Sequence, residues 1–172
     1  VLEERRDRTL ARMLVAPIRP TPIRVGKLLA SLVLGTVSMV VLAVTTGLVL
    51  GASWGDPIGV GALIVAGVIA ATAVMALVAT LANTPEQAGY WQSIVALVLG
   101  MLGGSFVPVA QAGGMIETLS LGTPHAWFLR GLGELSSGGG IGDIVVPLIA
   151  ILAFAGVCAA AALARIGRLV RP

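Results

Sequence analysis

Residues Val1–Lys27 read VLEERRDRTLARMLVAPIRPTPIRVGK, and Leu28–Gly55, which follow directly, read LLASLVLGTVSMVVLAVTTGLVLGASWG. The first stretch is rich in charged residues, whereas the second contains no ionisable side chain. As a helix, an uncharged run of this length exceeds the roughly 30 Å hydrocarbon core of a bilayer. The junction therefore predicts a surface segment that leads at once into a membrane span.

The composition of the whole chain also indicates a membrane protein. Hydrophobic residues make up 57% of the 172 residues and charged residues only 11%, with a mean hydropathy of +1.01. Soluble domains contain about 25% charged residues, so we expect the lipid bilayer to surround this chain. The net charge of +3 does not indicate nucleic-acid binding, because the basic residues gather near the two ends without interleaved aromatic side chains.

Four apolar segments predict an all-α, polytopic membrane helix bundle in a single domain, residues 1–172. The expected transmembrane helices cover residues 28–55, 58–81, 88–107 and 144–164. Cys158, the single cysteine, lies within the last of these segments, which excludes an intrachain disulfide and predicts a packing role.

Short motifs mark the ends of the expected spans. Trp54 fits an interfacial anchor, and Gly55-Asp56-Pro57 predicts a tight turn. Thr84 and Gln87 predict a capping box at the start of the third span. Glu86 in that motif is either an ion site or an acid that complements the helix dipole, and we favour the second interpretation.

Two glycine pairs offer small faces on which helices can approach closely. They are Gly47-x-x-x-Gly51 and Gly100-x-x-x-Gly104. Such pairs support helix contacts in membranes, although glycine-rich apolar sequences also produce them by chance.

Residues 108–143 form an external hairpin in this interpretation. Met115–Leu121 predicts a short apolar helix, and Thr123-Pro124 predicts the start of a helix of about a dozen residues that ends at Gly138-Gly139-Gly140. We expect a short re-entrant helix pair that dips into or lies on one face. The apolar side of the second helix should contain Trp127, Phe128, Leu132 and Leu135.

The first 24 residues are expected to lie at the membrane surface. Leu10, Met13 and Leu14 fall on one helical face, and charged residues occupy the others. Proline disfavours helix continuation, so a bent connector is predicted over residues 16–23, before a new helix near Arg24. The prolines concerned are Pro17, Pro20 and Pro22.

The distribution of basic residues predicts the orientation. With four spans, both termini and the loop at Asn83 share one side, which holds every Lys and Arg except Arg130. The positive-inside rule then places both termini in the cytoplasm and the chain in the cell (inner) membrane.

No motif points to an enzyme. Gly26-Lys27 lacks the first glycine and the final hydroxyl residue of a phosphate-binding loop, and Gly103–Val107 lacks the last glycine of a nucleophile elbow. His125 has no partner of metal-ligand spacing, so we expect a helix-start or interfacial residue. No catalytic site, metal site or bound cofactor is therefore predicted.

Several stretches resemble a known family. Glu4–Ile18, followed by Gly26-Lys27-Leu28-Leu29, is similar to the cytoplasmic loop of ABC-2 type transporter permeases. Glu86-Gln87-Ala88, Gly103–Pro108 and Thr123–Trp127 resemble that family's fifth span and external hairpin. The resemblance covers nearly the whole chain, although Arg8 and Ala16 depart from a usual glycine and a frequent threonine.

The resemblance implies a six-span fold, of which this chain holds spans three to six and lacks the first two. The opening segment, residues 1–24, would be the coupling helix that docks on an ABC ATP-binding subunit. The ATPase-facing residues would be Glu4, Arg5, Thr9, Leu10, Arg12 and Met13. The external gate or hairpin would involve Phe106, Pro108, Pro124 and Trp127.

The implied function is that of the permease subunit of an ATP-driven exporter, such as a multidrug exporter. Two permease copies, identical or different, would work with two ATP-binding subunits that use the ATP and Mg. The alternative is a non-transporting membrane scaffold or assembly subunit. A small membrane enzyme is a third interpretation, which the lack of catalytic motifs disfavours.

Overall fold

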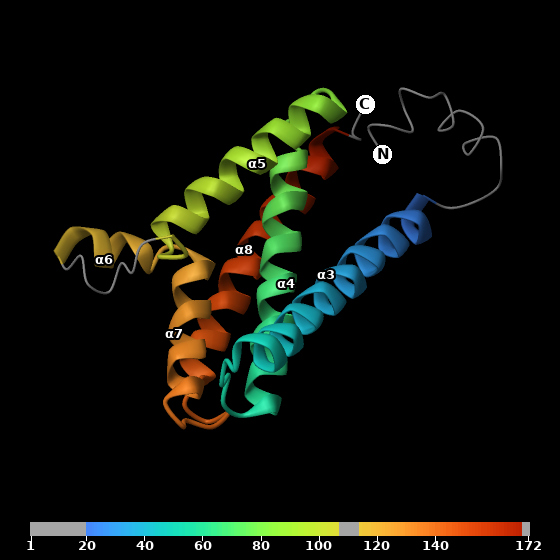
Figure 1. Cartoon of the computed structure of the whole chain (residues 1–172). Helices are drawn as coiled ribbons and strands as arrows, with labels where there is room; N and C mark the ends of the chain where they lie inside the picture. Colours follow the sequence, from blue (N-terminus) through green and yellow to red (C-terminus); the bar gives the residue numbers. More distant parts are fainter. Residues whose placement is uncertain (1–19, 107–113, 170–172) are drawn as a thin grey trace.

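The computed structural model describes residues 20–106 and 114–169, and these residues form helices without any strand (Figure 1). In chain order the helices are α3 (Pro20–Leu50), α4 (Pro57–Ala79), α5 (Pro85–Leu102), α6 (Gly114–Ser120), α7 (Pro124–Ser136) and α8 (Val145–Leu169). The predicted all-α bundle is confirmed. Residues 1–19 of the predicted coupling segment lie outside the described residues.

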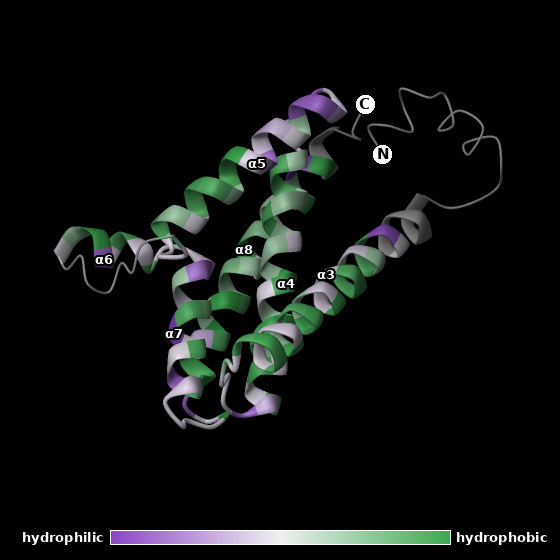
Figure 2. Cartoon of the chain, in the orientation of Figure 1, coloured by the Kyte–Doolittle hydropathy of each residue, from purple (hydrophilic) through white to green (hydrophobic). Residues whose placement is uncertain are grey.

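Three described helices are long and apolar enough to cross a membrane, judged by length and composition. The qualifying segments are Gly26–Leu50, Pro57–Ala79 and Val145–Ile166, and Figure 2 shows them mainly hydrophobic, with paler bands between the green ones. Helix α5 has only 18 residues and a hydrophilic first half, so it is not among them. The helix predicted over 88–107 is present, while its role as a fourth span stays a prediction.

The connections alternate between the two ends of the bundle. The start of α3, the α4–α5 connection and the end of α8 lie at one end, and the α3–α4 and α7–α8 connections lie at the other (Figure 1). Helices α3 and α4 are therefore antiparallel, whereas α4 and α8 run parallel.

Helix α3 begins earlier than predicted. The connector expected over residues 16–23 is wrong for its second half, because the helix already includes Pro20 and Pro22. Both prolines fall in the first turn, where amide groups have no intrahelical partner and the fixed proline φ suits a helix.

Helix α3 also ends before the predicted boundary at residue 55. Leu50 is its last residue, and Gly51 has a left-handed φ of +66°. The Trp54 indole nitrogen then donates a hydrogen bond to the carbonyl oxygen of Ala43 at 3.0 Å, so the half-buried ring folds back along α3. In the turn that follows, the Asp56 carboxylate accepts from the amide of Gly59 at 2.8 Å and caps α4.

Helix α4 is the central element of the bundle. It contacts α3, α5, α7 and α8, most extensively α8. The face of α8 toward the core has buried residues at three- and four-residue intervals, as helix packing requires. These residues are Ile151, Ala155, Cys158 and Ala162. The predicted packing role of Cys158 agrees with this position.

Glycines bring α4 and α7 into close contact. A Cβ added at Gly67 would lie 3.0 Å from the ring of Phe128, and one at Gly59 would lie 2.7 Å from the Leu135 side chain. In the reverse sense, Leu63 of α4 fills the space at Gly131, 2.9 Å from a Cβ built there. Alternating large and small residues thus interlock the two helices.

The glycine pairs noted in the sequence, Gly47/Gly51 and Gly100/Gly104, are not the glycines that bring α4 and α7 together. The atoms nearest to a Cβ at Gly47 and Gly100 belong to Ala52 and Phe106, in the loop that follows each helix, and nothing lies within 4 Å of one at Gly51. Gly51 and Gly104 lie beyond the helix ends with positive φ, so within the described residues these pairs form no helix contact, and such a contact stays a prediction.

Local capping signals are largely confirmed. Thr84 caps α5 by accepting from the Gln87 amide at 3.2 Å, and Thr123 caps α7 by accepting from the Ala126 amide at 3.3 Å. The Gln87 side chain bonds to the amide of Asn83 at 2.8 Å, one residue before the cap, so the reciprocal bond of a standard capping box is displaced.

The hairpin helices form as predicted, with α7 packed in the bundle. The short apolar helix is α6, and α7 has 13 residues with Leu135 fully buried. Helix α7 lies against α4 and α8 (Figure 1), while the exposed Arg130 of α7 pairs with Glu117 of α6 at 3.4 Å. The second hairpin helix therefore belongs to the helix core.

Replacing Gly55 by alanine should destabilise the fold strongly. Gly55 has a φ of +84°, and an added Cβ would overlap the carbonyl of Leu135 at the end of α7. Left-handed strain costs about 1–2 kcal/mol and overpacking a further 1–3 kcal/mol. We expect a clearly lower thermal midpoint for Gly55→Ala in detergent. Gly51→Ala, with φ +66° and open space, should show only the smaller backbone effect; equal losses would contradict the contact with α7.

Candidate functional site

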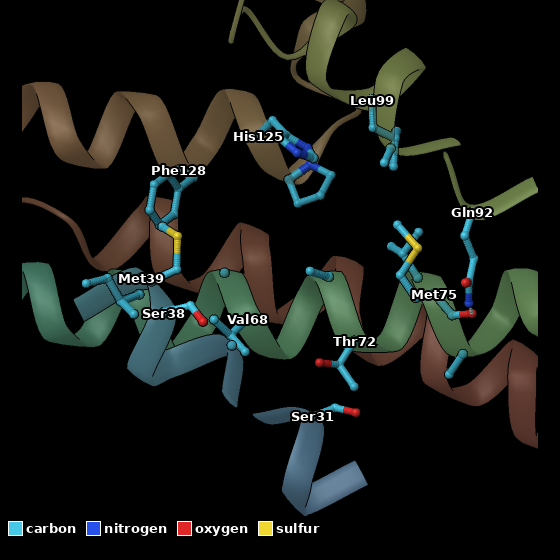
Figure 3. A pocket seen from close by; sticks show the side chains of 18 of the residues that line it. Ser31, Ser38, Met39, Val68, Thr72, Met75, Gln92, Leu99, His125 and Phe128 are labelled. Carbon is cyan, nitrogen blue, oxygen red and sulfur yellow. Dashed lines mark hydrogen bonds between the residues drawn. The ribbon is translucent and has the colours of Figure 1, made fainter. Parts of the chain in front are cut away.

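A cavity of about 910 Å³ lies between α3, α4, α5 and α7 (Figure 3). It extends from Leu28, Ala79 and Gln92, toward one end of the bundle, to Met39, Ile64 and Phe128 in its other half. Lining residues such as Ala71 and Ala96 remain exposed, so the cavity is open to its surroundings. Its volume suits a ligand of drug or lipid size.

The cavity exists because α3 and α4 cross at one point and separate beyond it. The contact is at Gly35, where an added Cβ would lie 2.7 Å from the Val68 side chain. Figure 1 shows α3 leaving α4 toward the end that contains its own start. The wall contributed by α4 has small side chains, which leaves the space unfilled. These include Gly67, Ala71, Ala76 and Ala79.

Polar groups are distributed along the apolar walls. They are Ser31, Ser38, Thr72, Gln92, Ser105 and His125. The Gln92 amide nitrogen donates to the carbonyl oxygen of Met75 at 3.1 Å, which joins α5 to α4. No Asp, Glu, Lys or Arg is found among the described residues that line the cavity.

His125 lies in the first turn of α7, next to the Thr123 cap. Its Nδ1 is buried and has no hydrogen-bond partner within the described part of the chain. Burial lowers the pKa of His125 below 6.5, because the charged imidazolium loses its hydration. The side chain is therefore neutral at pH 7, and the cavity contains no fixed charge from this group.

Of the predicted hairpin residues that the structure describes, Pro124 alone lines the cavity, and the gate role of the set stays a prediction. Phe106 is exposed near the cavity's rim residue Ser105. Trp127 is not among the lining residues: its indole nitrogen donates to the carbonyl oxygen of Leu121 at 2.9 Å, and Arg130 lies 5.5 Å from the ring centre. Pro108 lies outside the described residues.

The predicted ATPase-facing residues all precede Pro20 and lie outside the described residues. Glu86 occupies the first turn of α5, where an acid complements the helix dipole, and it does not line the cavity. Within residues 20–106 and 114–169, no three His, Cys, Asp or Glu side chains form a group that could hold a metal ion.

The residues that sequence reasoning missed are the polar ones of the cavity wall. Ser31, Thr72 and Gln92 were detectable as polar side chains inside or beside apolar helices. Their common location was not, because it depends on where α3 crosses α4.

Comparison with known proteins gives the family. The profile of a family described as ABC-2 family transporter protein matches residues 1–164. The chain belongs to the ABC-2 transporter family. The match to this family includes the charged leader, residues 1–24, as well as the described helices, in agreement with the resemblance seen in the sequence.

One curated protein similar to this chain is the linearmycin resistance permease protein LnrN of Bacillus subtilis (strain 168). The two are 26% identical over 164 residues, which cover 95% of this chain and 43% of the relative. The chain thus spans less than half the length of that protein. No solved structure matches the present chain.

The neutral state of His125 predicts a pH-dependent contribution to stability. With its pKa below 6.5 in the folded state, His125 binds fewer protons than in the unfolded state, so stability is lost as the pH falls below 6.5. The thermal midpoint of the native protein should drop more between pH 7.5 and 5.5 than that of His125→Gln. Parallel curves for the two proteins would show that burial does not shift this group.

Proposed function

We propose that this chain is the membrane-spanning permease part of an ATP-driven exporter and works with a separate ABC ATP-binding subunit. The observation that carries the proposal is the family match across residues 1–164, which joins the charged leader and the helical bundle in one unit. The cavity beside α3 supports it, because a transport subunit needs a space that its helices can open and close.

The leader is the contact with the ATP-binding subunit in this proposal. Its ATPase-facing residues are those with a charged or amphipathic pattern, from Glu4 to Met13. Met13 precedes the start of α3 at Pro20 by seven positions. Because this connection is short, a large displacement of the leader would also move α3. ATP and Mg are used by the partner subunit.

Helix α3 is suited to transmit that displacement. No residue of its apolar segment Gly26–Leu50 is buried, and its main packing partner is α4. Moving α3 would change mainly its contacts with α4, while α4, α7 and α8 keep their packing on one another. Because α3 forms one wall of the cavity, its displacement would change the width of the cavity.

Export is the direction we propose. The name of LnrN connects that permease with linearmycin resistance, and removal of a toxic compound from the cell is a direct route to resistance. We extend this direction to the present chain, with drugs among its cargoes. A second permease copy, identical or different, completes the proposed transporter within the lipid bilayer.

The proposed orientation puts both chain ends in the cytoplasm of the cell membrane. On a Cys158→Ala background, Asn83→Cys should react with a membrane-impermeant maleimide only in inside-out vesicles, and Gly140→Cys only in intact cells. Asn83 is exposed in the α4–α5 connection, and a Cβ at Gly140 meets no atom within 4 Å in the α7–α8 connection. Reaction of both cysteines from the same side would overturn the orientation.

The leader should contact the ATP-binding subunit. In a complex of the complete permease with its cognate subunit, Leu10→Cys should form a crosslink through a cysteine-to-lysine reagent. Leu48→Cys is the matched control: Leu48 is 82% exposed on α3 but lies near the opposite end of that helix, so it should give no crosslink.

Absence of a Leu10 crosslink would refute the coupling role. The same complex, reconstituted in liposomes, should show ATPase activity above that of the isolated ATP-binding subunit. Unchanged ATPase activity in a complex that assembles normally would favour the scaffold interpretation over the exporter.

A further inference from the structure

Several hydroxyl groups of the cavity have no hydrogen-bond partner within the described part of the chain. They belong to Ser31, Ser38 and Thr72, and a fourth such hydroxyl, that of Ser105, lies in the loop after α5. Serine and threonine in a helix often satisfy themselves on their own backbone, as Thr80 does with the carbonyl of Leu77 at 2.7 Å and Ser93 with that of Gly89 at 3.0 Å. The cavity hydroxyls remain available to another molecule.

Two of these hydroxyl-bearing side chains, on α3 and α4, lie near each other in the cavity lining. Helices α3 and α4 are antiparallel and cross at Gly35 and Val68. Ser31 is one turn before Gly35 and Thr72 one turn after Val68, so both lie on the side where the helices separate. Figure 3 shows the two side chains near each other, with α3 and α4 as their supports.

Gln92 contributes an acceptor on the opposite wall. Its amide nitrogen is committed to the Met75 carbonyl at 3.1 Å, which leaves the amide oxygen for a donor from outside the protein. Gln92 and Thr72 line the same cavity from α5 and α4. A ligand between them can therefore meet both donors and acceptors.

The electrostatics of the cavity exclude charged ligands. Its described lining offers no carboxylate, ammonium or guanidinium group, and burial keeps His125 neutral. A charged group inside an apolar cavity without a counter-ion has a high desolvation cost. The remaining lining is apolar and includes Met39, Met75 and Phe128.

We propose that this cavity is a binding site for an uncharged amphiphile, a molecule with an apolar chain or body and hydroxyl or carbonyl groups. The apolar part lies along α4 between Ile64 and Ala79, and the polar groups bond to Thr72, Ser31 and Gln92. The proposal that an amphiphile binds here rests on the cavity and its lining residues alone. Only the role of the bound amphiphile as cargo rests on the proposed export function.

The test is photolabelling of the complete permease in lipid nanodiscs with three probes that share one diazirine-bearing sixteen-carbon chain. The probes end in a hydroxyl, a carboxylate or a trimethylammonium group. Peptide mapping should locate the label of the alcohol on residues 64–79, with competition by unlabelled hexadecanol. The two charged probes should label these residues at least about tenfold less.

Variants separate hydrogen bonding from the shape of the cavity. Thr72→Val keeps the side-chain volume and should weaken labelling by the alcohol roughly three- to tenfold, the effect of one lost hydrogen bond. Thr45→Val is its control, because Thr45 is exposed on α3 and does not line the cavity. Ala71→Phe should abolish labelling by filling the space, whereas Ala160→Phe on the exposed face of α8 should not.

Each contrary outcome overturns a definite part of the proposal. Equal labelling by the three probes would mean that the cavity is an unselective lipid groove. Label confined to the outer helix faces would mean that protein fills the cavity in the complete permease. Selective binding without ATP-dependent transport of the alcohol would leave the site intact and count against the export function.

Discussion

The structure depends on the burial of α4 among its neighbours. In a bilayer the lipid tails are as apolar as leucine, so helix association relies on close packing and on cross-helix hydrogen bonds. Helix α4 meets this constraint with Gly59, Leu63 and Gly67, which interlock with Leu135, Gly131 and Phe128 of α7. It meets α8 along the stripe of Ile151, Ala155 and Cys158. These two contacts make a rigid core of three helices.

The remaining helices are attached to this core more loosely, and the cavity is the consequence. Helix α3 touches α4 closely at Gly35 and has no buried residue in its apolar segment. Helix α5 is joined to α4 through Gln92 and exposes large side chains such as Tyr90, Ile94 and Met101. Both helices still pack on the core with some side chains, such as Met39 of α3 and Leu99 of α5, but neither has a large buried face.

Local features of the fold were accessible from the sequence, whereas pairings between distant residues were not. The caps at Thr84 and Thr123 involve residues three positions apart, so the chain alone specifies them. The start of α3 at Pro20 was missed, since two prolines suggested a break although a first turn tolerates them. The glycines that matter, Gly59 and Gly67, had no distinguishing local pattern, because their partners Leu135 and Phe128 lie 76 and 61 residues further along the chain. The cavity was missed for the same reason.

In the proposed transporter, the loose attachment of α3 and the polar groups of the cavity together couple ligand binding to the position of α3. An uncharged ligand between Ser31 on α3 and Thr72 on α4 would bridge a movable wall and a wall that belongs to the core. Its hydrogen bonds would then be strongest at one separation of the two helices and weaker at any other. A displacement of α3 by the leader would change the affinity of the cavity directly, since a ligand and a helix position that favour each other are thermodynamically linked. Release of the ligand would therefore need no rearrangement of the packing between α4, α7 and α8.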